Sequence, residues 1–285
     1  MPDTLNPIVD ELTTPAPLVS WLLPGLLPAE VLFTLVGVPG AGKSYFAYSL
    51  GLALAGGVPV LGVSPICPTR VLYCDQENSR ADRLQYQRWA WRGVGTPALA
   101  LMAQNFWAAP FALGCDDWEE VLANLLEQHQ PQLIIIDTAT SACNINDENH
   151  NGEAQHTVNT LRRLMTRANA GCLVLKHARV DKADGEFMTR GAKTWESSPD
   201  GVWYLKRAQG RPYANGWVNL LLTPKKTRAF GLRDDYHLIP HVVMGGTAKL
   251  PEVLGHRLEA RRVHRFKDTP RVDRGIDATD SALVS

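Results

Sequence analysis

Residues 31–44 read Val-Leu-Phe-Thr-Leu-Val-Gly-Val-Pro-Gly-Ala-Gly-Lys-Ser, an apolar β-rich run followed by a glycine-rich loop. The next segment, Tyr45 to Ala55, is expected to form a helix. Glycines allow the loop to curl so that its N–H groups face phosphate oxygens, and the N-terminus of the helix adds positive potential. This strand, loop and helix predict a binding site for a nucleoside triphosphate.

Within the loop, Lys43 is placed to reach the β- and γ-phosphates, and Ser44 is placed to hold a magnesium ion. A nucleoside triphosphate with its magnesium ion is therefore the expected ligand. The predicted nucleotide-binding residues of this segment are Gly37, Val38, Pro39, Gly40, Ala41, Gly42, Lys43, Ser44 and Tyr45.

The composition of the 285-residue chain indicates a globular protein, because 45% of its residues are hydrophobic and its formal net charge is zero. The sequence has neither a long apolar run nor a signal-peptide pattern at Met1, so we expect a cytoplasmic protein without membrane association. Its five cysteines form no Cys-x-x-Cys pair, and we expect them to be reduced.

Residues 203–233 contain seven Lys or Arg and no acidic residue. They indicate either an anion-facing surface or a solvated basic face.

Apolar runs alternate with helical patterns from Val31 to about Ala178, which predicts an α/β fold with a mostly parallel central sheet and helices on both faces. Residues 202–205 and 217–222 are expected to add an antiparallel C-terminal extension. The other expected strands are 31–36, 70–75, 133–137 and 172–175, and the expected helices are 45–55, 79–91, 116–129 and 153–169.

The domain organisation is expected to centre on one domain over residues 31–245. Residues 1–30 are rich in Pro and Leu and are interpreted as an irregular lead-in. Residues 179–200 are polar and contain Gly, which predicts a long loop. Residues 246–285 are charged and lack periodicity, which predicts a poorly ordered tail.

Hydrolysis of a triphosphate needs a metal-positioning acid and a base that activates water. Asp137 ends an apolar run and suits the first role through a bound water, with a helix N-cap as its alternative role. Glu77 follows the strand of residues 70–75, and the ends of parallel strands meet at one edge of the sheet. Glu77 is therefore the predicted base, and Asp75 is the alternative.

Three later residues are candidates for contact with the γ-phosphate. His177 comes directly after an apolar strand and is predicted either to sense this phosphate or to be satisfied by backbone groups there. Lys226 and Arg228 alternate onto one face at the end of a late strand. They are predicted either to reach across a subunit interface or to form local salt bridges.

The order of these motifs resembles the RecA-like P-loop ATPases, especially the hexameric replicative helicases of the plasmid RepA and DnaB kind. The resemblance covers roughly residues 20–240. It rests on the passages Gly37 to Ser44, Val71 to Asn78, Leu133 to Thr138, Asp147 to Asn149, Leu173 to Ala178, and Arg190-Gly191.

The resemblance implies ATP and Mg²⁺ as ligands. It makes Lys43 the phosphate contact, Ser44 a magnesium contact, Glu77 the catalytic base, Asp137 the Walker-B metal acid and His177 the sensor. It also implies that Lys226 and Arg228 complete the nucleotide site of a neighbouring subunit.

Two positions depart from the RepA pattern. Lys176 stands where a second histidine is common, and Trp203 stands near the place of the trans-acting arginine. Arg228 is therefore the first candidate for that arginine, and Arg207 is the second.

The resemblance further implies a RepA-type DNA helicase in plasmid or phage replication, working as a homo-oligomeric ring such as a hexamer on single-stranded DNA. The corresponding DNA loops are residues 140–152 and 179–194, where Phe187 and Trp195 are candidates for base stacking. The first loop is acidic, and Trp195 can instead anchor its loop to the core. One alternative is an ATPase switch that regulates replication or recombination by ATP-dependent assembly, and a weaker one is a small-molecule kinase.

Overall fold

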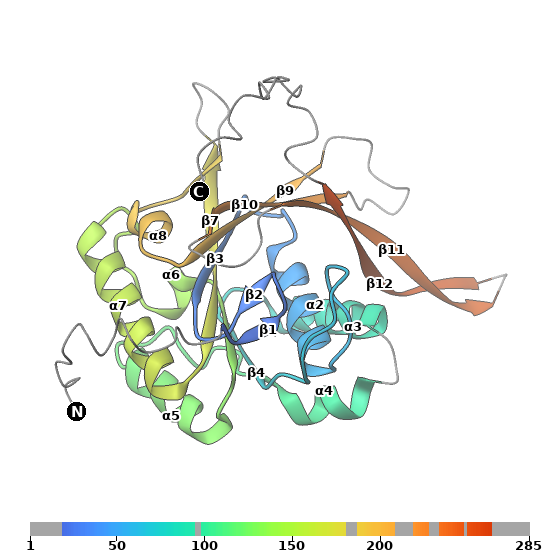
Figure 1. The fold of residues 1–285 in the computed structure, drawn as a ribbon, viewed down its shortest axis with the longest axis horizontal. Coiled ribbons are helices and arrows are strands. Elements are labelled where there is room, and N and C mark those ends of the chain that lie inside the picture. The colour runs from blue at the N-terminus through green and yellow to red at the C-terminus, as the bar shows by residue number, and fades with distance from the viewer. Residues whose placement is uncertain are drawn as a thin grey trace, which may run out of the picture.

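The computed structural model describes residues 19–94, 98–180, 187–208, 219–227, 234–247 and 250–263. Within these ranges, ten strands form one sheet in which neighbouring strands follow the order β12-β11-β10-β9-β3-β7-β6-β4-β5, with β8 pairing to β7. Figure 1 shows helices on both sides of the parallel part of this sheet. The expected α/β class is confirmed.

The elements have the following bounds. The strands are β1 (Trp21–Leu23), β2 (Leu27–Pro28), β3 (Leu32–Gly37), β4 (Val71–Asp75), β5 (Phe106–Ala108), β6 (Leu133–Asp137), β7 (Gly171–Val180), β8 (Phe187–Thr189), β9 (Gly201–Arg207), β10 (Leu220–Thr227), β11 (Asp235–Thr247) and β12 (Leu250–Val263). The helices are α2 (Lys43–Ala55), α3 (Arg80–Val94), α4 (Leu99–Asn105), α5 (Trp118–His129), α6 (Ala139–Ala142), α7 (Asn151–Ala168) and α8 (Thr194–Ser197).

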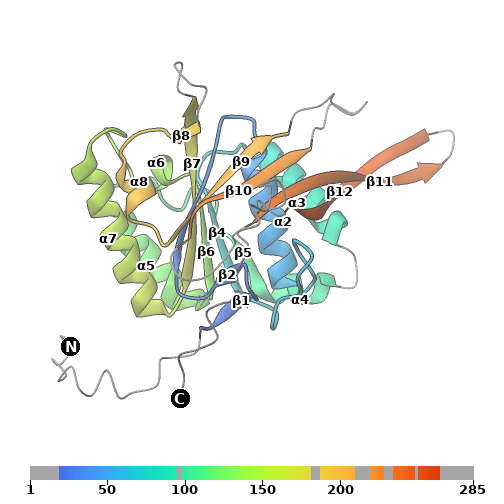
Figure 2. The same cartoon turned by 45° about the horizontal axis from the view of Figure 1, so that its top comes forward.

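The core of the sheet is parallel and lies between two helical layers. Strands β9, β3, β7, β6, β4 and β5 pair in parallel. One face packs on α2 and α4 through side chains such as Leu35 and Ile135. The other packs on α5 and α7 through side chains such as Leu32 and Ile134, as Figure 2 shows. Because both faces are covered, the buried parts of these strands are continuous apolar runs, such as Leu133–Ile136 in β6, rather than alternating patterns.

The C-terminal extension is antiparallel, as expected, but it begins one strand later than the sequence suggested. Strand β9 runs parallel to β3 and antiparallel to β10, and β10, β11 and β12 continue antiparallel. The close approach of β9 to β3 requires Gly201, because a Cβ there would lie 1.9 Å from the Phe33 ring. Trp203 then packs against Phe33 with ring centroids 4.9 Å apart.

Three expectations about segments outside the main elements differ from the structure. The lead-in forms the β1–β2 pair and buries Leu22, Leu23, Leu26 and Leu27 in the core. The expected loop over residues 179–200 contains β8 and α8. The expected tail from residue 246 contains β12, whose backbone pairs with β11. These elements depend on pairing and burial against distant segments, which local composition does not report.

Two bulk expectations concern membranes and cysteines. Among the described residues, no helix combines the length and apolar character needed to cross a bilayer. All five cysteines are free thiols, as expected. Burial raises the pKa of Cys74 to about 12, so this thiol is protonated and unreactive at neutral pH.

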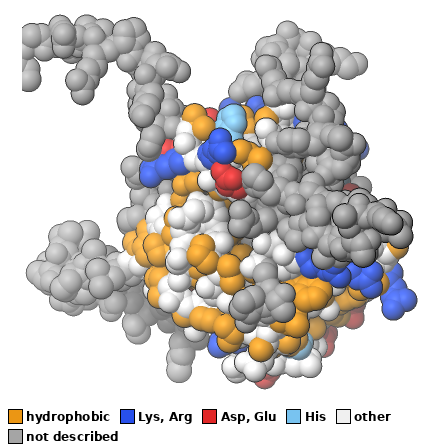
Figure 3. Space-filling view, turned by 90° about the vertical axis from the view of Figure 1, so that its right-hand side faces the viewer, with side chains coloured by type: hydrophobic (Ala, Val, Ile, Leu, Met, Phe, Trp, Pro, Cys, Tyr) orange, Lys and Arg blue, Asp and Glu red, His pale blue; other side chains and the backbone are white. Residues whose placement is uncertain are grey.

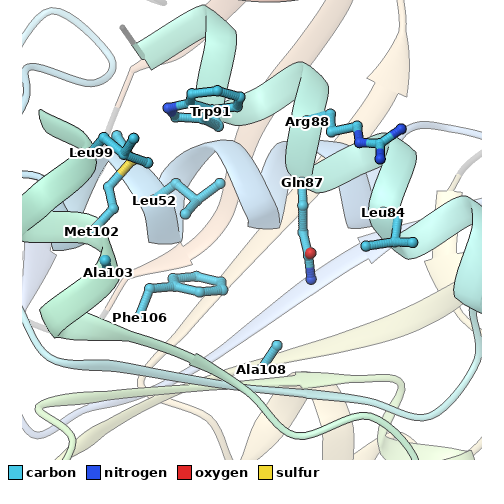
Figure 4. A pocket seen from close by; sticks show the side chains of 10 residues that line it. All are labelled: Leu52, Leu84, Gln87, Arg88, Trp91, Leu99, Met102, Ala103, Phe106 and Ala108. Atoms are coloured by element: carbon cyan, nitrogen blue, oxygen red, sulfur yellow. The ribbon is translucent and has the colours of Figure 1, made fainter. Parts of the chain in front are cut away.

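An apolar groove lies between α3 and α4, on the side of the molecule seen in Figure 3. It has a volume of about 380 Å³, and Figure 4 shows its lining: Leu52, Leu84, Gln87, Arg88, Trp91, Leu99, Met102, Ala103, Phe106 and Ala108. None of the sequence-predicted site residues lines this groove.

Candidate nucleotide site

Strand pairing brings the predicted site residues to one edge of the sheet. The register pairs Gly37 with His177 across β3 and β7, and Asp75 with Asp137 across β4 and β6. Strand β7 lies between β3 and β6, so the end of β7 stands between the phosphate loop and Asp137. Parallel strands present their carboxyl ends at one crevice, where open α/β sheets bind ligands.

The glycine-rich loop has the curled backbone that an anion-binding loop needs. Gly40 and Gly42 have φ values of 70° and 89°, a region that other residues rarely adopt. Gly42 is the N-cap of α2 and makes no side-chain cap hydrogen bond. The dipole of α2 favours an anion at this end of the helix.

Lys43 lies inside the loop, with only 6% of its surface exposed. Its Nζ donates to the carbonyl oxygens of Gly37 (2.9 Å) and Val38 (3.3 Å) and lies 3.3 Å from Nδ1 of His177. Burial lowers the pKa of the ammonium group, and the charges of Asp137 and Glu77 oppose that shift. A phosphate group would restore the solvation that this cation has lost.

His177 connects Lys43 to Glu77. Its Nε2 lies 3.1 Å from Oε1 of Glu77. Because the Lys43 ammonium can only donate, Nδ1 is the acceptor and Nε2 carries the proton that is donated to Glu77. This hydrogen bond from His177 is the main cause that holds the pKa of Glu77 below its ordinary value. The ring thus contacts two site residues, which favours the sensor interpretation over satisfaction by backbone groups.

Two buried carboxyl groups lie beside this chain of contacts. Asp137 accepts a hydrogen bond from the hydroxyl of Tyr73 (2.9 Å), and Asp75 accepts one from Tyr48 (2.9 Å). The two tyrosine rings stack with centroids 3.9 Å apart. Asp75 is fully buried, whereas the side chain of Glu77 is 41% exposed. Only Glu77 is open to a water molecule, so the geometry favours Glu77 over Asp75 as the base.

The oxygen atoms around Asn78 fit a magnesium ion. Its Nδ2 lies 3.1 Å from both carboxyl oxygens of Asp75, 3.2 Å from Oδ2 of Asp137 and 3.4 Å from Oγ of Ser44. An amide nitrogen carries only two protons and cannot donate to four acceptors at once. This surplus of oxygen acceptors suits a hard cation with its water shell. Among the described residues, no group of three or more His, Cys, Asp or Glu could hold a metal ion by itself.

The Asp137 carboxyl group makes stability depend on pH. Burial, followed by the charges of Asp75 and Glu77, raises its pKa to about 6. A carboxyl group with a raised pKa contributes its full stabilisation at pH values below its ordinary pKa, and this contribution is lost as the pH rises through about 6. The pKa in the folded protein lies roughly two units above the ordinary pKa, which corresponds to roughly 3 kcal/mol of stability.

Asp137→Asn is therefore expected to increase the free energy of unfolding at pH 8, by up to roughly 3 kcal/mol. At pH 4 the effect is expected to be small, because the wild-type carboxyl group is then already protonated in the folded protein. Urea unfolding of both proteins at the two pH values measures the difference. Equal effects at pH 4 and pH 8 would contradict the pKa argument.

The candidates for a trans-acting role lie in different places. Arg228 is outside the described residues. Lys226 donates to the backbone oxygens of Glu196, Ser197 and Pro199 of its own chain, so its contact with a nucleotide stays a prediction. Arg207 donates to the carbonyl of Gly40 in its own phosphate loop (2.8 Å).

The two predicted DNA loops are joined by a series of polar contacts. Lys176 donates to Oγ1 of Thr140 (2.7 Å), Thr140 donates to Glu148 (2.9 Å), and Glu148 pairs with Arg190 (3.1 Å). Trp195 is fully buried with Lys176 over its ring, so it anchors its loop and is unavailable for base stacking. The side chain of Phe187 lies outside the described residues.

Four residues of the site escaped the sequence analysis in the role that the structure gives them: Tyr48, Tyr73, Asp75 and Asn78. Asn78 directly follows Glu77, and its position was the one available signal. Tyr48 and Tyr73 read as ordinary apolar positions of a helix and a strand. Their hydroxyl groups gain a role only through the carboxyl groups that the sheet places beside them.

Comparison with known proteins agrees with this site. A family model described as an AAA domain matches residues 2–183. Among solved structures, the chain is similar to the RadB recombinase, with 16% sequence identity and a TM-score of 0.49 over 74% of this chain and 88% of that chain. No curated protein matches the chain. The family match covers more than half of the sequence and includes the phosphate loop, Glu77, Asp137 and His177. The chain therefore belongs to the AAA domain family.

Proposed function

We propose that this protein hydrolyses ATP at the edge where β3, β4, β6 and β7 end. The observation that carries the proposal is the unbroken series of contacts from Lys43 through His177 to Glu77, with Asp137 close by. A cation for phosphate, an exposed carboxylate for water and a ring that links them are the groups that phosphoryl transfer to water requires.

In this proposal Lys43 and the loop N–H groups bind the β- and γ-phosphates. Glu77 accepts a proton from a water molecule while the oxygen of that water bonds to the γ-phosphorus. The bond between the γ-phosphorus and the oxygen that bridges the β- and γ-phosphates breaks, and ADP and phosphate leave. The carboxylate of Glu77 is ionised at neutral pH, and the hydrogen bond from His177 holds its pKa below the ordinary value.

In this proposal, Ser44 and, through a water molecule, Asp137 would hold Mg²⁺. When bound, such an ion neutralises charge on the β- and γ-phosphates. Asn78, which now lies among the same oxygens, would keep its contact with Asp75 and release Ser44.

The cellular function that we propose is a RepA-type DNA helicase acting in plasmid or phage DNA replication. The protein would assemble as a homo-oligomeric ring, such as a hexamer, in which Arg228 and Lys226 of one subunit complete the site of the next. Support comes from the order of the motifs and from the basic segment of residues 203–233, which suits single-stranded DNA.

A second candidate function is an ATPase switch that regulates replication or recombination through ATP-dependent assembly. The observation in its favour is the charge of the two loops. Glu148 neutralises Arg190, the segment from Asn144 to Asn149 is acidic, and Trp195 is buried. The described parts of these loops thus offer no exposed aromatic side chain to a DNA strand, and one of their basic groups, Arg190, is already paired.

Strand displacement on a forked DNA duplex distinguishes the two candidates. We expect the wild-type protein with ATP and Mg²⁺ to release the displaced strand, and Lys43→Ala to release none. ATP turnover without strand release would favour the regulatory ATPase. Phosphate release that requires an added acceptor molecule would favour the kinase alternative.

A further inference from the structure

The carboxyl group of Asp75 accepts hydrogen bonds from the turn that bears Glu77. Its Oδ1 accepts from the backbone N–H groups of Glu77 (3.2 Å) and Asn78 (3.0 Å). Its Oδ2 accepts from the hydroxyl of Tyr48 (2.9 Å). The carboxyl group is fully buried, so these contacts compete with no solvent.

These contacts connect two parts of the site that are far apart in sequence. Tyr48 belongs to α2, the helix that begins at Lys43 and fixes the phosphate loop. The turn after β4 carries Glu77. Asp75 therefore sets the position of the proposed base relative to the phosphate loop. A shift of about 1 Å in such a group lowers the rate by roughly 10²-fold.

The same carboxyl group also orients the metal side of the site. Nδ2 of Asn78 lies 3.1 Å from each oxygen of Asp75 and 3.2 Å from Asp137. The hydroxyl of Tyr73 donates a hydrogen bond to Asp137, and its ring stacks on that of Tyr48. Each carboxyl group thus has a tyrosine donor of its own, and Asn78 bridges the two.

We propose that Asp75 is a positioning residue for ATP hydrolysis, which holds the turn bearing Glu77 against α2 and beside Asp137. The inference rests on the proposed role of Glu77 as the base. Asp75 does not itself touch the reacting atoms, because it is buried and its oxygens face the turn, Tyr48 and Asn78.

Two substitutions separate positioning from direct chemistry. Asp75→Ala removes every acceptor, and kcat is expected to fall roughly 10²-fold while KM for ATP stays within about threefold. Asp75→Asn keeps an oxygen for the turn N–H groups, and its amide can donate to the Tyr48 hydroxyl. It is expected to recover kcat to within roughly tenfold of wild type. If Asp75 were instead a base or a metal ligand, it would need its negative charge, and kcat would fall as far in Asp75→Asn as in Asp75→Ala.

Hydrogen exchange measured by mass spectrometry gives a readout that needs no nucleotide. The backbone amides of Glu77 and Asn78 donate to Asp75 and are expected to exchange at least tenfold faster in Asp75→Ala than in wild type. In Asp75→Asn their exchange is expected to stay close to wild type. Asp82→Ala is the matched control, because this exposed aspartate contacts Ser79 outside the site. It is expected to leave kcat within about twofold and the two amides unchanged.

If Asp75→Ala does not fold, the double variant Asp75→Ala with Tyr48→Phe replaces it, because the second change removes the stranded buried hydroxyl. Unchanged amide exchange, kcat within threefold of wild type, or Asn as inactive as Ala would each overturn the proposal. An inactive wild-type protein, or an unaffected Glu77→Gln, would instead overturn the proposed function, and the amide exchange would still report on Asp75.

Discussion

Lys43→Ala is expected to weaken ATP binding by at least roughly 100-fold and to abolish hydrolysis. The lysine supplies the buried positive charge of the phosphate loop, and charge-assisted hydrogen bonds to phosphate are among the strongest in proteins. Truncation also removes the donor to His177, so the connection to Glu77 is lost. Equilibrium titration with a fluorescent ATP analogue measures the affinity.

The matched control is Lys193→Ala, which removes an exposed lysine outside the phosphate loop and is expected to leave the affinity for ATP within about twofold of wild type. Tight ATP binding by Lys43→Ala would contradict the assignment of the phosphate loop. Circular dichroism of both variants separates loss of binding from loss of fold.

The same variant tests whether sites are shared between subunits. Arg228→Ala keeps its phosphate loop, and Lys43→Ala keeps its Arg228, so a mixture should regain part of the activity that each lacks alone. Arg207 contacts Gly40 of its own chain, so Arg207→Ala is expected to gain nothing from mixing with Lys43→Ala. Rescue of Arg207→Ala but not of Arg228→Ala would reverse the ranking of the two arginines.

Glu77→Gln is expected to keep ATP binding within about threefold of wild type and to slow hydrolysis by roughly 10²- to 10⁴-fold. The amide retains the size of the side chain and an oxygen for the hydrogen bond from His177, but it cannot take a proton from water. Single-turnover hydrolysis with enzyme in excess isolates the chemical step from product release.

Glu120→Gln, on the exposed side of α5, makes the same change without touching the site and is expected to match wild type. If Glu77→Gln turns over at the wild-type rate, Glu77 is not the base. Asp75 would then become the candidate base only if Asp75→Asn were inactive.

Local patterns of the sequence were enough to predict the parallel core. Leu133–Ile136 is apolar throughout because both faces of β6 are covered, and that composition is visible in one short segment. The β11–β12 pair was not predicted, because charged residues conceal the pattern of Leu250–Val263 and its backbone partner is another strand. The lead-in was not predicted for a similar reason, because Leu22 and Leu27 are buried by contacts with the rest of the core.

The candidate site divides along the same line. The loop from Gly37 to Ser44 follows from sequence because a phosphate loop is a continuous segment whose glycines and lysine act at fixed spacing. Asp137 and Glu77 follow because the ends of parallel strands gather at one edge.

What the sequence alone determined is thus the ligand-binding loop and the acids at the strand ends, since each is encoded within a few neighbouring residues. The tertiary structure decided which acid faces water and which faces inward. Asp75 and Glu77 are two residues apart, yet one is buried under Tyr48 and the other reaches His177, one hundred residues away. The turn after β4 decides this difference, because β4 ends at Asp75 and Glu77 no longer follows the alternation of the strand.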